Sequence, residues 1–238
     1  MGIKYKVNEN FFKTWSRNSA YVLGFIYADG HLEDASYIRG KYVRFTSADR
    51  SLLGKIRSSL NSSHKIAAIP AQGRRKEIHR LRIGSHKIYY DLENIGLHPR
   101  KSLDMEFPQV PYRFLPDFVR GYFDGDGCLA FEKMKNRPHD RLKVIFTSGS
   151  KRFLDSLEYA LKTRCLGKTS KVYDSHNSYQ LSYRSKDALK VLEFMYSKAG
   201  ERNLLYLDRK YNKYKRLALN PGAFRCANLF DRQSRIWN

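Results

Sequence analysis

The sequence predicts an α+β fold made of two copies of one αββαββα unit. A nine-residue segment occurs twice, at residues 22–30 and 119–127, and each copy has an apolar start, a glycine at its third place and Asp-Gly at its end. The tripeptide Phe-Thr-Ser also occurs twice, at residues 45–47 and 146–148, directly before an expected helix each time. Helical and strand-like spacings of apolar residues then follow in the same order in both halves. These matches indicate an internal duplication with a repeat of about 100 residues.

The first copy is expected to contain three helices and four short strands. Asn18 or Ser19 is a suitable cap for the first helix, and Arg39-Gly40 is a suitable turn between the first two strands. Gly96 is expected to end the third helix. The expected helices span 18–28, 49–60 and 85–95, and the expected strands span 31–37, 41–47, 65–70 and 77–84.

The second copy repeats this order after a proline-rich connection. Three prolines within residues 99–111 predict a linker, and Pro111 and Pro116 fit the start of the next helix. The expected helices span 113–127, 151–163 and 185–199, and the expected strands span 128–134, 141–148, 168–174 and 179–184. We therefore divide the chain into a lead-in (1–17), a first repeat (18–98), the linker (99–111), a second repeat (112–216) and a C-terminal tail (217–238).

The two repeated segments predict a pair of helices that pack closely and end in carboxylates. Gly24 and Gly121 have no Cβ atom, so the two helix backbones can approach each other there. Such packing would bring Asp29 and Asp126 together at one end of the pair. A single Asp-Gly is a common helix stop, but two matched copies favour a paired-carboxylate metal site. Mg²⁺ fits an all-oxygen set of carboxylates, carbonyls and water, and Mn²⁺ or Ca²⁺ could occupy the same site.

The charge balance points to a polyanionic partner. The chain has 45 Lys and Arg against 23 Asp and Glu, a formal net charge of +22, and its 42% hydrophobic residues allow a real core. Nucleic acid is the first choice, because clustered cations gain from counterion release at phosphates. An anionic membrane surface is the weaker alternative, since no apolar run approaches the ~20 residues of a spanning helix. A polar N-terminus and three widely spaced cysteines are typical of an intracellular protein of the cytoplasm, the nucleoid or an organelle.

A divalent metal ion on paired carboxylates can hydrolyse a phosphodiester of a bound nucleic acid, and two lysines and two serines are further candidates for a part in such a reaction. Lys101 and Lys210 each follow the last helix of a repeat and could offset the charge that develops on a scissile phosphate. The alternative is that both are solvated basic residues. Ser47 and Ser148 stand at the strand ends nearest the two acids and could order a hydrolytic water.

Strand alternation leaves one face of each expected sheet free to contact DNA. In residues 141–147 every second residue is apolar, namely Leu142, Val144 and Phe146, and these are expected to face the helices. The residues between them are therefore expected to point outward. Arginine and lysine on such a face could read guanine edges or hold phosphates, although a solvated surface is the alternative for any one of them. The candidates are Tyr42, Arg44, Thr46, Arg80 and Arg82 in the first repeat, Arg141, Lys143 and Thr147 in the second, and Arg74, Arg75, Lys76, Lys133, Lys135 and Arg137 in two basic turns.

With these motifs, residues 18–216 resemble the LAGLIDADG family of homing endonucleases, in its single-chain form with two motifs. The heptapeptide at 96–102 and the hexapeptide at 206–211 are similar to those of bacterial and archaeal intron-type members. The resemblance implies two repeats related by a pseudo-twofold axis, with the motif helices at their interface. It also implies that the two antiparallel sheets form a saddle that binds DNA.

The resemblance assigns the metal site to the ends of the two motifs. Asp29 and Asp126 match the metal-binding acids, and the carbonyl groups of Ala28 and Gly125 match neighbouring ligands. One departure is Tyr27, which stands where the second motif has Asp124. Because the eighth place of the motif holds the metal ligand, this departure is not expected to matter.

The activity implied by the resemblance is that of a monomeric, Mg²⁺-dependent endonuclease. Such an enzyme cuts both strands of a long, specific DNA site across the minor groove and leaves short 3′ overhangs. The alternative is a non-catalytic nucleic-acid binder on the same fold, either a maturase that binds intron RNA or a transcription regulator. Regulators of this kind carry an added helix-turn-helix, for which residues 217–238 are too short and irregular.

Overall fold

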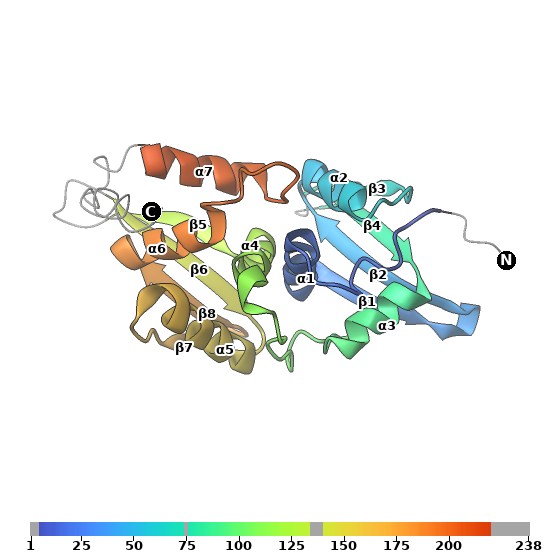
Figure 1. The fold of residues 1–238 in the computed structure, drawn as a ribbon, viewed down its shortest axis with the longest axis horizontal. Helices are drawn as coiled ribbons and strands as arrows, with labels where there is room; N and C mark the ends of the chain where they lie inside the picture. Colours follow the sequence, from blue (N-terminus) through green and yellow to red (C-terminus); the bar gives the residue numbers. More distant parts are fainter. Residues whose placement is uncertain (1–4, 74–75, 134–139, 220–238) are drawn as a thin grey trace.

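The computed structural model describes residues 5–73, 76–133 and 140–219, which form two repeats side by side (Figure 1). The first repeat consists, in chain order, of α1 (Arg17–Asp29), β1 (Gly30–Ala35), the 3₁₀ turn η1 (Ser36–Ile38), β2 (Gly40–Ser47), α2 (Arg50–Ser59), β3 (Ile66–Ile69), β4 (Ile78–Gly84) and α3 (His86–Asn94). The second consists of η2 (Tyr112–Phe114), α4 (Leu115–Asp126), β5 (Cys128–Glu132), β6 (Arg141–Ser148), α5 (Lys151–Leu161), the π-helical turn η3 (Lys162–Leu166), β7 (Val172–Asp174), β8 (Tyr179–Arg184), α6 (Ser185–Tyr196) and α7 (Asp208–Leu219).

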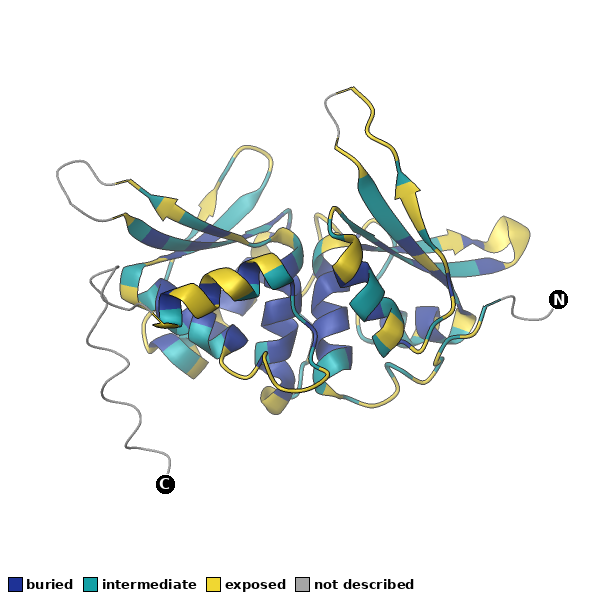
Figure 2. Ribbon diagram, turned by 90° about the horizontal axis from the view of Figure 1, so that it is seen from above, coloured by how far each residue is buried: buried dark blue, intermediate teal, exposed yellow. Residues whose placement is uncertain are grey.

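The two sheets share one topology, which confirms the α+β class and the internal duplication. The strand order is β1-β2-β4-β3 in the first repeat and β5-β6-β8-β7 in the second, and all neighbouring strands are antiparallel. The sheets splay apart on one side of the molecule, and helices cover the other side (Figure 2). Helices α1 and α4 stand between the two repeats, where the motif helices are expected.

The hydrophobic core continues from one sheet through the central helices to the other sheet. Val43 and Phe45 in β2, and Val144 and Phe146 in β6, are at most 1% exposed, as the predicted alternation requires. Helix α1 is buried along most of its length, because apolar or small residues surround its axis on all sides. Helix α4 is also buried along most of its length, with Asp117, Arg120 and Asp124 among its buried residues. The two motif helices therefore serve as the shared core of both repeats.

Several element ends differ from the expectation: α4 begins at Leu115 and not at 113, α6 ends at Tyr196 and not at 199, and β7 begins at Val172 and not at 168. Helix α1 begins at Arg17, because Ser16 and not Asn18 or Ser19 is its N-cap. The Ser16 and Ser19 side chains accept hydrogen bonds from each other's backbone N–H groups, which is a capping box. Helix α5 ends at Leu161, and the chain then continues into the π-helical turn η3. The π-helical turn has no signal in the apolar spacing.

Helix α7 is not predicted by the sequence. Most of its residues are charged or polar, so only a few apolar residues mark its buried side. Tyr214 and Leu217 are nevertheless buried, and the helix contacts α6. Neither α7 nor any other helix of the described ranges has the length and apolarity needed to cross a membrane.

Candidate active site and nucleic-acid interface

Helices α1 and α4 contact each other through their backbones at two glycines. A Cβ atom on Gly24 would lie 2.0 Å from the carbonyl oxygen of Phe118, and a Cβ atom on Gly121 would lie 2.0 Å from the carbonyl oxygen of Tyr21. The contacts are reciprocal, as expected of two equivalent helices that run in parallel. Any side chain larger than hydrogen would force the backbones apart at these positions.

This close packing brings the C-terminal ends of the two helices together. A Cβ atom on Gly125 would lie 2.4 Å from the Cβ atom of Ala28 and 3.5 Å from Oδ2 of Asp29. Asp126 follows directly in the chain, and its charge acts on Asp29. The structure thus places both acids at one end of the helix pair, between the two sheets.

The environment of the two acids disfavours their charged forms. Both carboxylates reach solvent, but the packed helix ends remove part of their hydration. This burial, with the charge of Asp126 as a second cause, raises the pKa of Asp29 to about 6. Burial also raises the pKa of Asp126, against the opposing charges of Lys101 and Lys210. Among the described residues, none donates a hydrogen bond to either carboxylate or forms an ion pair with it.

A divalent cation fits this pair of acids. Two partly desolvated carboxylates without protein partners are stabilised by a cation between them. Ala28 and Gly125 belong to the last helical turns, where carbonyl groups lack a partner within the helix. The described residues contain no cluster of three or more His, Cys, Asp or Glu side chains suited to a metal. The protein therefore offers two carboxylates and nearby carbonyls, which is a set that suits Mg²⁺ with phosphate and water as further ligands.

We expect the metal-free protein to lose stability as the pH rises through the range in which Asp29 ionises. An unperturbed aspartate has a pKa of about 3.9. Because the pKa of Asp29 in the fold is about 6, the folded state binds more protons between these values, and its stability falls toward neutral pH. In EDTA at pH 7.5, Asp29→Asn should therefore melt at a higher temperature than the wild type, while near pH 4 the two should melt alike.

Thermal unfolding measured at both pH values, with EDTA and with MgCl₂, checks this expectation. Added Mg²⁺ should raise the melting temperature of the wild type at pH 7.5 and leave that of Asp29→Asn nearly unchanged. A wild type that melts above the variant in EDTA at pH 7.5 would contradict the assignment.

Lys101 and Lys210 are buried, so the view of them as solvated basic residues is wrong. Lys101 Nζ donates to the carbonyl oxygen of Gly30 at 3.0 Å, and Lys210 Nζ donates to that of Gly127 at 2.6 Å. These are equivalent positions after α1 and α4, where the helix dipole favours a cation. Burial lowers the pKa of each lysine to about 8, although the nearby acids act in the opposite direction. Their catalytic role stays a prediction.

Ser47 and Ser148 use their hydroxyl oxygens in the turns that precede α2 and α5. Ser47 Oγ accepts a hydrogen bond from the N–H of Asp49, and Ser148 Oγ accepts one from the N–H of Ser150, each at 3.0 Å. Asp49 and Ser150 are the N-caps of the two helices. The serines therefore help to build matching turns, and their part in ordering water stays a prediction.

The structure gives Asp124 a role that the sequence does not predict. Its buried carboxylate accepts hydrogen bonds from the hydroxyl of Tyr21 at 2.8 Å, the hydroxyl of Tyr196 at 2.5 Å and the N–H of Leu207 at 2.8 Å. Burial raises its pKa, against these hydrogen bonds. Asp124 thus ties α4 to α1, to α6 and to the segment that leads into α7, where Lys210 lies. Because α4 also carries Asp117, Arg120 and Asp126, no signal in the sequence sets Asp124 apart.

Replacement of Asp124 by Asn is expected to lower the free energy of unfolding by about 1–3 kcal/mol. The amide has one acceptor oxygen and two donor hydrogens, so at least one of the three buried donors would face another donor. Urea unfolding measures the change. Asp155→Asn is the control, because Asp155 lies on the surface in an i,i+4 pair with Lys151 and should change stability by only ~0.5 kcal/mol. Equal effects of the two substitutions would contradict the role of Asp124.

The predicted DNA-contacting residues share the outer faces of the two sheets. Arg44 lies opposite Arg82, and Thr46 lies opposite Arg80, in the pairing of β2 with β4. The outward-facing residues are Tyr42, Arg44, Thr46, Arg80 and Arg82 in the first sheet, and Arg141, Lys143 and Thr147 in the second. Lys76 and Lys133 are exposed beside the strands, whereas Arg74, Arg75, Lys135 and Arg137 lie outside the described residues.

Each outer face also carries a glutamate that the sequence analysis missed. Glu33 forms ion pairs with Arg44 and with Arg82, whose Nε lies 2.7 Å from Oε2. Glu132 accepts two hydrogen bonds from Arg141, at 2.6 and 3.0 Å. These carboxylates fix the orientation of the arginines before any ligand binds. Glu33 lies opposite Tyr42 in the pairing of β1 with β2, and Glu132 lies opposite Arg141 in the pairing of β5 with β6. An acidic residue on the outward-facing side of a strand, beside predicted basic strands, is the sequence signal that could have indicated these ion pairs.

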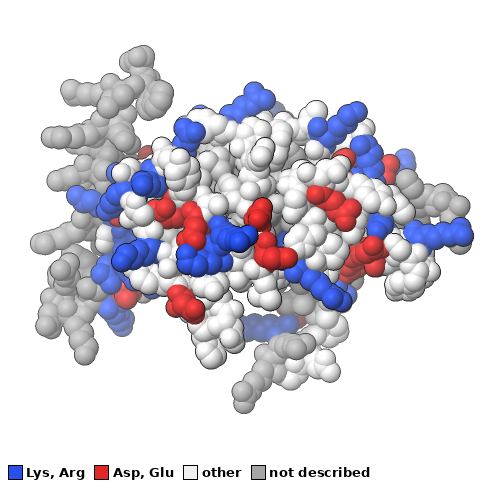
Figure 3. Space-filling model, turned by 90° about the horizontal axis from the view of Figure 1, so that it is seen from below, with Lys and Arg blue, Asp and Glu red and all other residues white. Residues whose placement is uncertain are grey.

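Net charge alone does not mark the interface. On the face seen from below, Lys and Arg side chains are spread over both repeats, with Asp and Glu among them (Figure 3). The pairing of the strands, and not the charge, shows which basic residues lie on the outer faces of the sheets. Arg184, opposite Lys143, is a further cation of the second outer face that the sequence analysis did not name.

Comparison with known proteins identifies the second repeat directly. Residues 114–195 match the family described as LAGLIDADG-like domain. The second repeat is thus similar to the LAGLIDADG-like domain family. Since the first repeat has the same sheet topology, the whole chain has the two-repeat LAGLIDADG fold.

Solved structures with this fold include three homing endonucleases with DNA. The structure of I-WcaI bound to its DNA recognition sequence has a TM-score of 0.57 at 12% identity and covers 87% of this chain and 91% of that one. I-DmoI in complex with DNA and Ca has a TM-score of 0.55 at 20% identity, and the match covers 87% of this chain and 99% of that one. I-AabMI bound to uncleaved DNA has a TM-score of 0.54 at 14% identity, and the match covers 86% of this chain and 92% of that one. At these identities the likeness establishes the LAGLIDADG fold.

Two curated relatives are similar over one part of their length. The probable translation initiation factor IF-2 of Methanocaldococcus jannaschii is 25% identical over 190 residues, which are 77% of this chain and 14% of that protein. The replication factor C small subunit of Thermococcus kodakarensis is 25% identical over 155 residues, 63% of this chain and 16% of that protein. The chain thus spans about a seventh of the length of these relatives. The similarity to bacterial and archaeal intron-type members stays a prediction.

Proposed function

We propose that the chain is a site-specific endonuclease that cuts both strands of double-stranded DNA with a divalent metal ion. The observation that supports this most directly is the meeting of Asp29 and Asp126 between two basic sheet faces. A buried lysine lies beside each acid at the end of the motif helix. The similar homing endonucleases are described in complexes with DNA, one of them with Ca.

The two outer sheet faces would hold the duplex, one repeat on each half of the target. Arginines held by Glu33 and Glu132 are already oriented, so less side-chain entropy is lost when they bind bases or phosphates. The duplication then places the acids near the middle of the bound site. The resemblance to homing endonucleases implies a cut on each strand across the minor groove, with short 3′ overhangs.

The chemistry would depend on both halves of the helix pair. Asp29, Asp126 and the carbonyls of Ala28 and Gly125 would hold the metal, which supplies a nucleophilic water and charge stabilisation for phosphodiester hydrolysis. Lys101 and Lys210, with a pKa of about 8, are mostly protonated at neutral pH. Their positive charges would stabilise the negative charge that grows on the phosphate oxygens.

Selection of cleaved sites from a randomised DNA library tests this proposal. With MgCl₂ the protein should enrich one long target, and the recovered ends should carry short 3′ overhangs; EDTA should stop the cleavage. Enrichment of a bound target without any Mg²⁺-dependent cut would instead support a non-catalytic binder. Light scattering on the protein–DNA complex checks the expected stoichiometry of one chain per site.

A further inference from the structure

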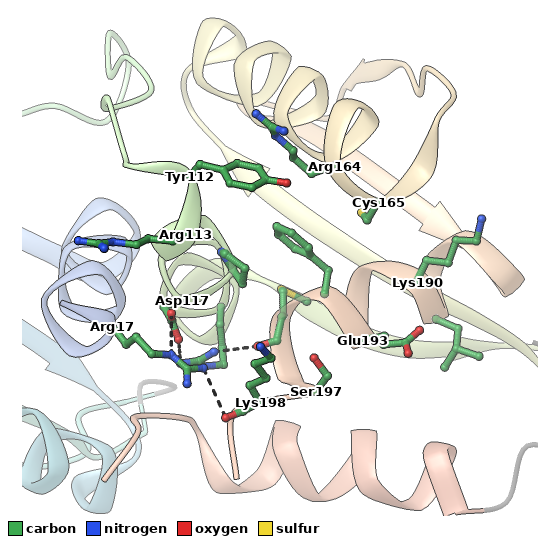
Figure 4. Close-up of a pocket in the computed structure, with 15 residues that line it drawn as sticks. Arg17, Tyr112, Arg113, Asp117, Arg164, Cys165, Lys190, Glu193, Ser197 and Lys198 are labelled. Carbon is green, nitrogen blue, oxygen red and sulfur yellow. Dashed lines mark hydrogen bonds and ion pairs between the residues drawn. The ribbon is translucent and has the colours of Figure 1, made fainter. Parts of the chain in front are cut away.

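A cavity of about 690 Å³ lies at the N-terminal ends of the motif helices (Figure 4). Its wall is formed by the first turns of α1 and α4, by η2, by η3 and by α6. Since α1 rises ~1.5 Å per residue, Arg17 at its start lies about 18 Å from Asp29 at its end. The cavity is therefore a separate site, and DNA held by the outer sheet faces would not occupy it.

The charges that line this cavity are unbalanced. Two of its arginines, Arg17 and Arg120, are engaged with Asp117, at 3.2 and 2.6 Å. Glu193 is the other acid of the lining. Four further cations line the cavity, and within the described ranges their side chains make no hydrogen bond or ion pair: Arg113, Arg164, Lys190 and Lys198. The cavity is therefore suited to an anion that carries more than one negative charge.

An exposed aromatic ring gives the cavity a second kind of recognition. Tyr112 is 58% exposed, and the guanidinium of Arg164 lies over its ring at 3.6 Å from the centroid. Leu189 and Phe194 add apolar surface. A planar group can stack on such an aromatic and guanidinium pair. The volume also falls within the ~300–1,000 Å³ of ligand sites for small molecules.

The cavity depends on a feature that the duplication does not explain. The π-helical turn η3 extends α5 and places Arg164 and Cys165 on the wall. Helix α2, the equivalent of α5, ends at Ser59 without such a turn. π-Helical turns are rare and occur frequently at functional sites. Burial raises the pKa of the Cys165 thiol to about 12, so this residue lines the wall as an inert group.

We propose that this cavity binds a phosphorylated nucleoside. The base would stack beside Tyr112 and Arg164, and the phosphate would be held by Lys190 of α6 and by Lys198, which follows the end of that helix. Tyr112 and Arg164 lie together on one side of the cavity and Lys198 lies on the opposite side, which matches a ligand that has a planar ring at one end and its charge at the other (Figure 4). The site goes beyond the proposed DNA cleavage and does not depend on it.

Isothermal titration of the full chain with AMP, ATP, adenosine and inorganic phosphate tests the proposal. AMP and ATP should bind at one site per chain, and more tightly than adenosine or phosphate. Arg164→Ala and the double substitution Lys190→Gln/Lys198→Gln should each weaken AMP binding about tenfold or more, because each removes charged contacts. Lys186→Gln, on the same helix but outside the cavity, and Lys143→Gln, on the sheet face, should leave binding unchanged. Circular dichroism of each variant confirms that it is folded.

Two further comparisons, of a dinucleotide with AMP and of phosphate with AMP, identify the ligand. A 5′-phosphorylated dinucleotide that binds more tightly than AMP would identify the ligand as the end of a strand, and weaker binding would identify it as a free nucleotide; both support the proposal. Phosphate that binds as tightly as AMP would overturn the nucleoside assignment. Failure of AMP and the dinucleotide to bind, or equal binding by the cavity and control variants, would overturn the site.

Discussion

Asp29→Asn and Asp126→Asn are each expected to abolish double-strand cleavage while DNA binding is kept. Each substitution keeps the size of the side chain and removes one of the two carboxylates that meet at the end of the helix pair. A metal ion contributes several kcal/mol of transition-state stabilisation, so the rate should fall on the order of a thousandfold or more. The outer sheet faces are untouched, so affinity for the target should change little.

Cleavage of the selected target in MgCl₂ and binding of the same DNA in EDTA should be measured side by side. Asp34→Asn is the control, because this acid lies at the far end of β1 and pairs with Lys41 on the surface. It should cut as the wild type does. Undiminished cutting of both strands by either of the active-site variants would remove the basis for the proposed endonuclease.

The parts of the fold that depend on local patterns could be predicted from the sequence. The bounds of β6 and β8 follow from two-residue alternation bounded by polar turns, and Ser85 marks the start of α3 because its side chain caps that helix. The pairing of the acids also follows, since Gly24 and Gly121 permit two equivalent helices to approach closely at matching positions. In each case a short stretch contains the physical reason for the structure.

The parts that depend on contacts between distant segments could not be predicted. Asp124 accepts hydrogen bonds from residues 72 to 103 positions away in the chain, so no local pattern indicates its burial. The sequence names Lys101 as a candidate, but its burial beside the carbonyl of Gly30 follows from the fold alone. Helix α7 is polar along most of its length, and the cavity at η3 involves four separate segments. Such features follow from the three-dimensional packing alone.

Gly24→Ala and Gly121→Ala are each expected to lower the free energy of unfolding by on the order of 3 kcal/mol. The added methyl group would lie 2.0 Å from a backbone carbonyl oxygen of the partner helix, which cannot move as a flexible side chain can. Urea unfolding measures the effect. Gly54→Ala is the control, since a Cβ atom on this glycine of α2 meets no atom within 4 Å. It should stabilise the protein by ~0.5–1 kcal/mol through its higher helix propensity.

The double variant Gly24→Ala/Gly121→Ala distinguishes helix displacement from a general loss of packing. One outward shift of α1 from α4 relieves both clashes, so the second substitution should cost less than the first, and the two effects should not add. The same shift would separate Asp29 from Asp126, and the folded fraction of each single variant should therefore cut DNA more slowly than its stability alone explains. Additive losses of stability with normal cleavage by the folded fraction would show that the two glycines act independently, and that the spacing of the acids is set elsewhere.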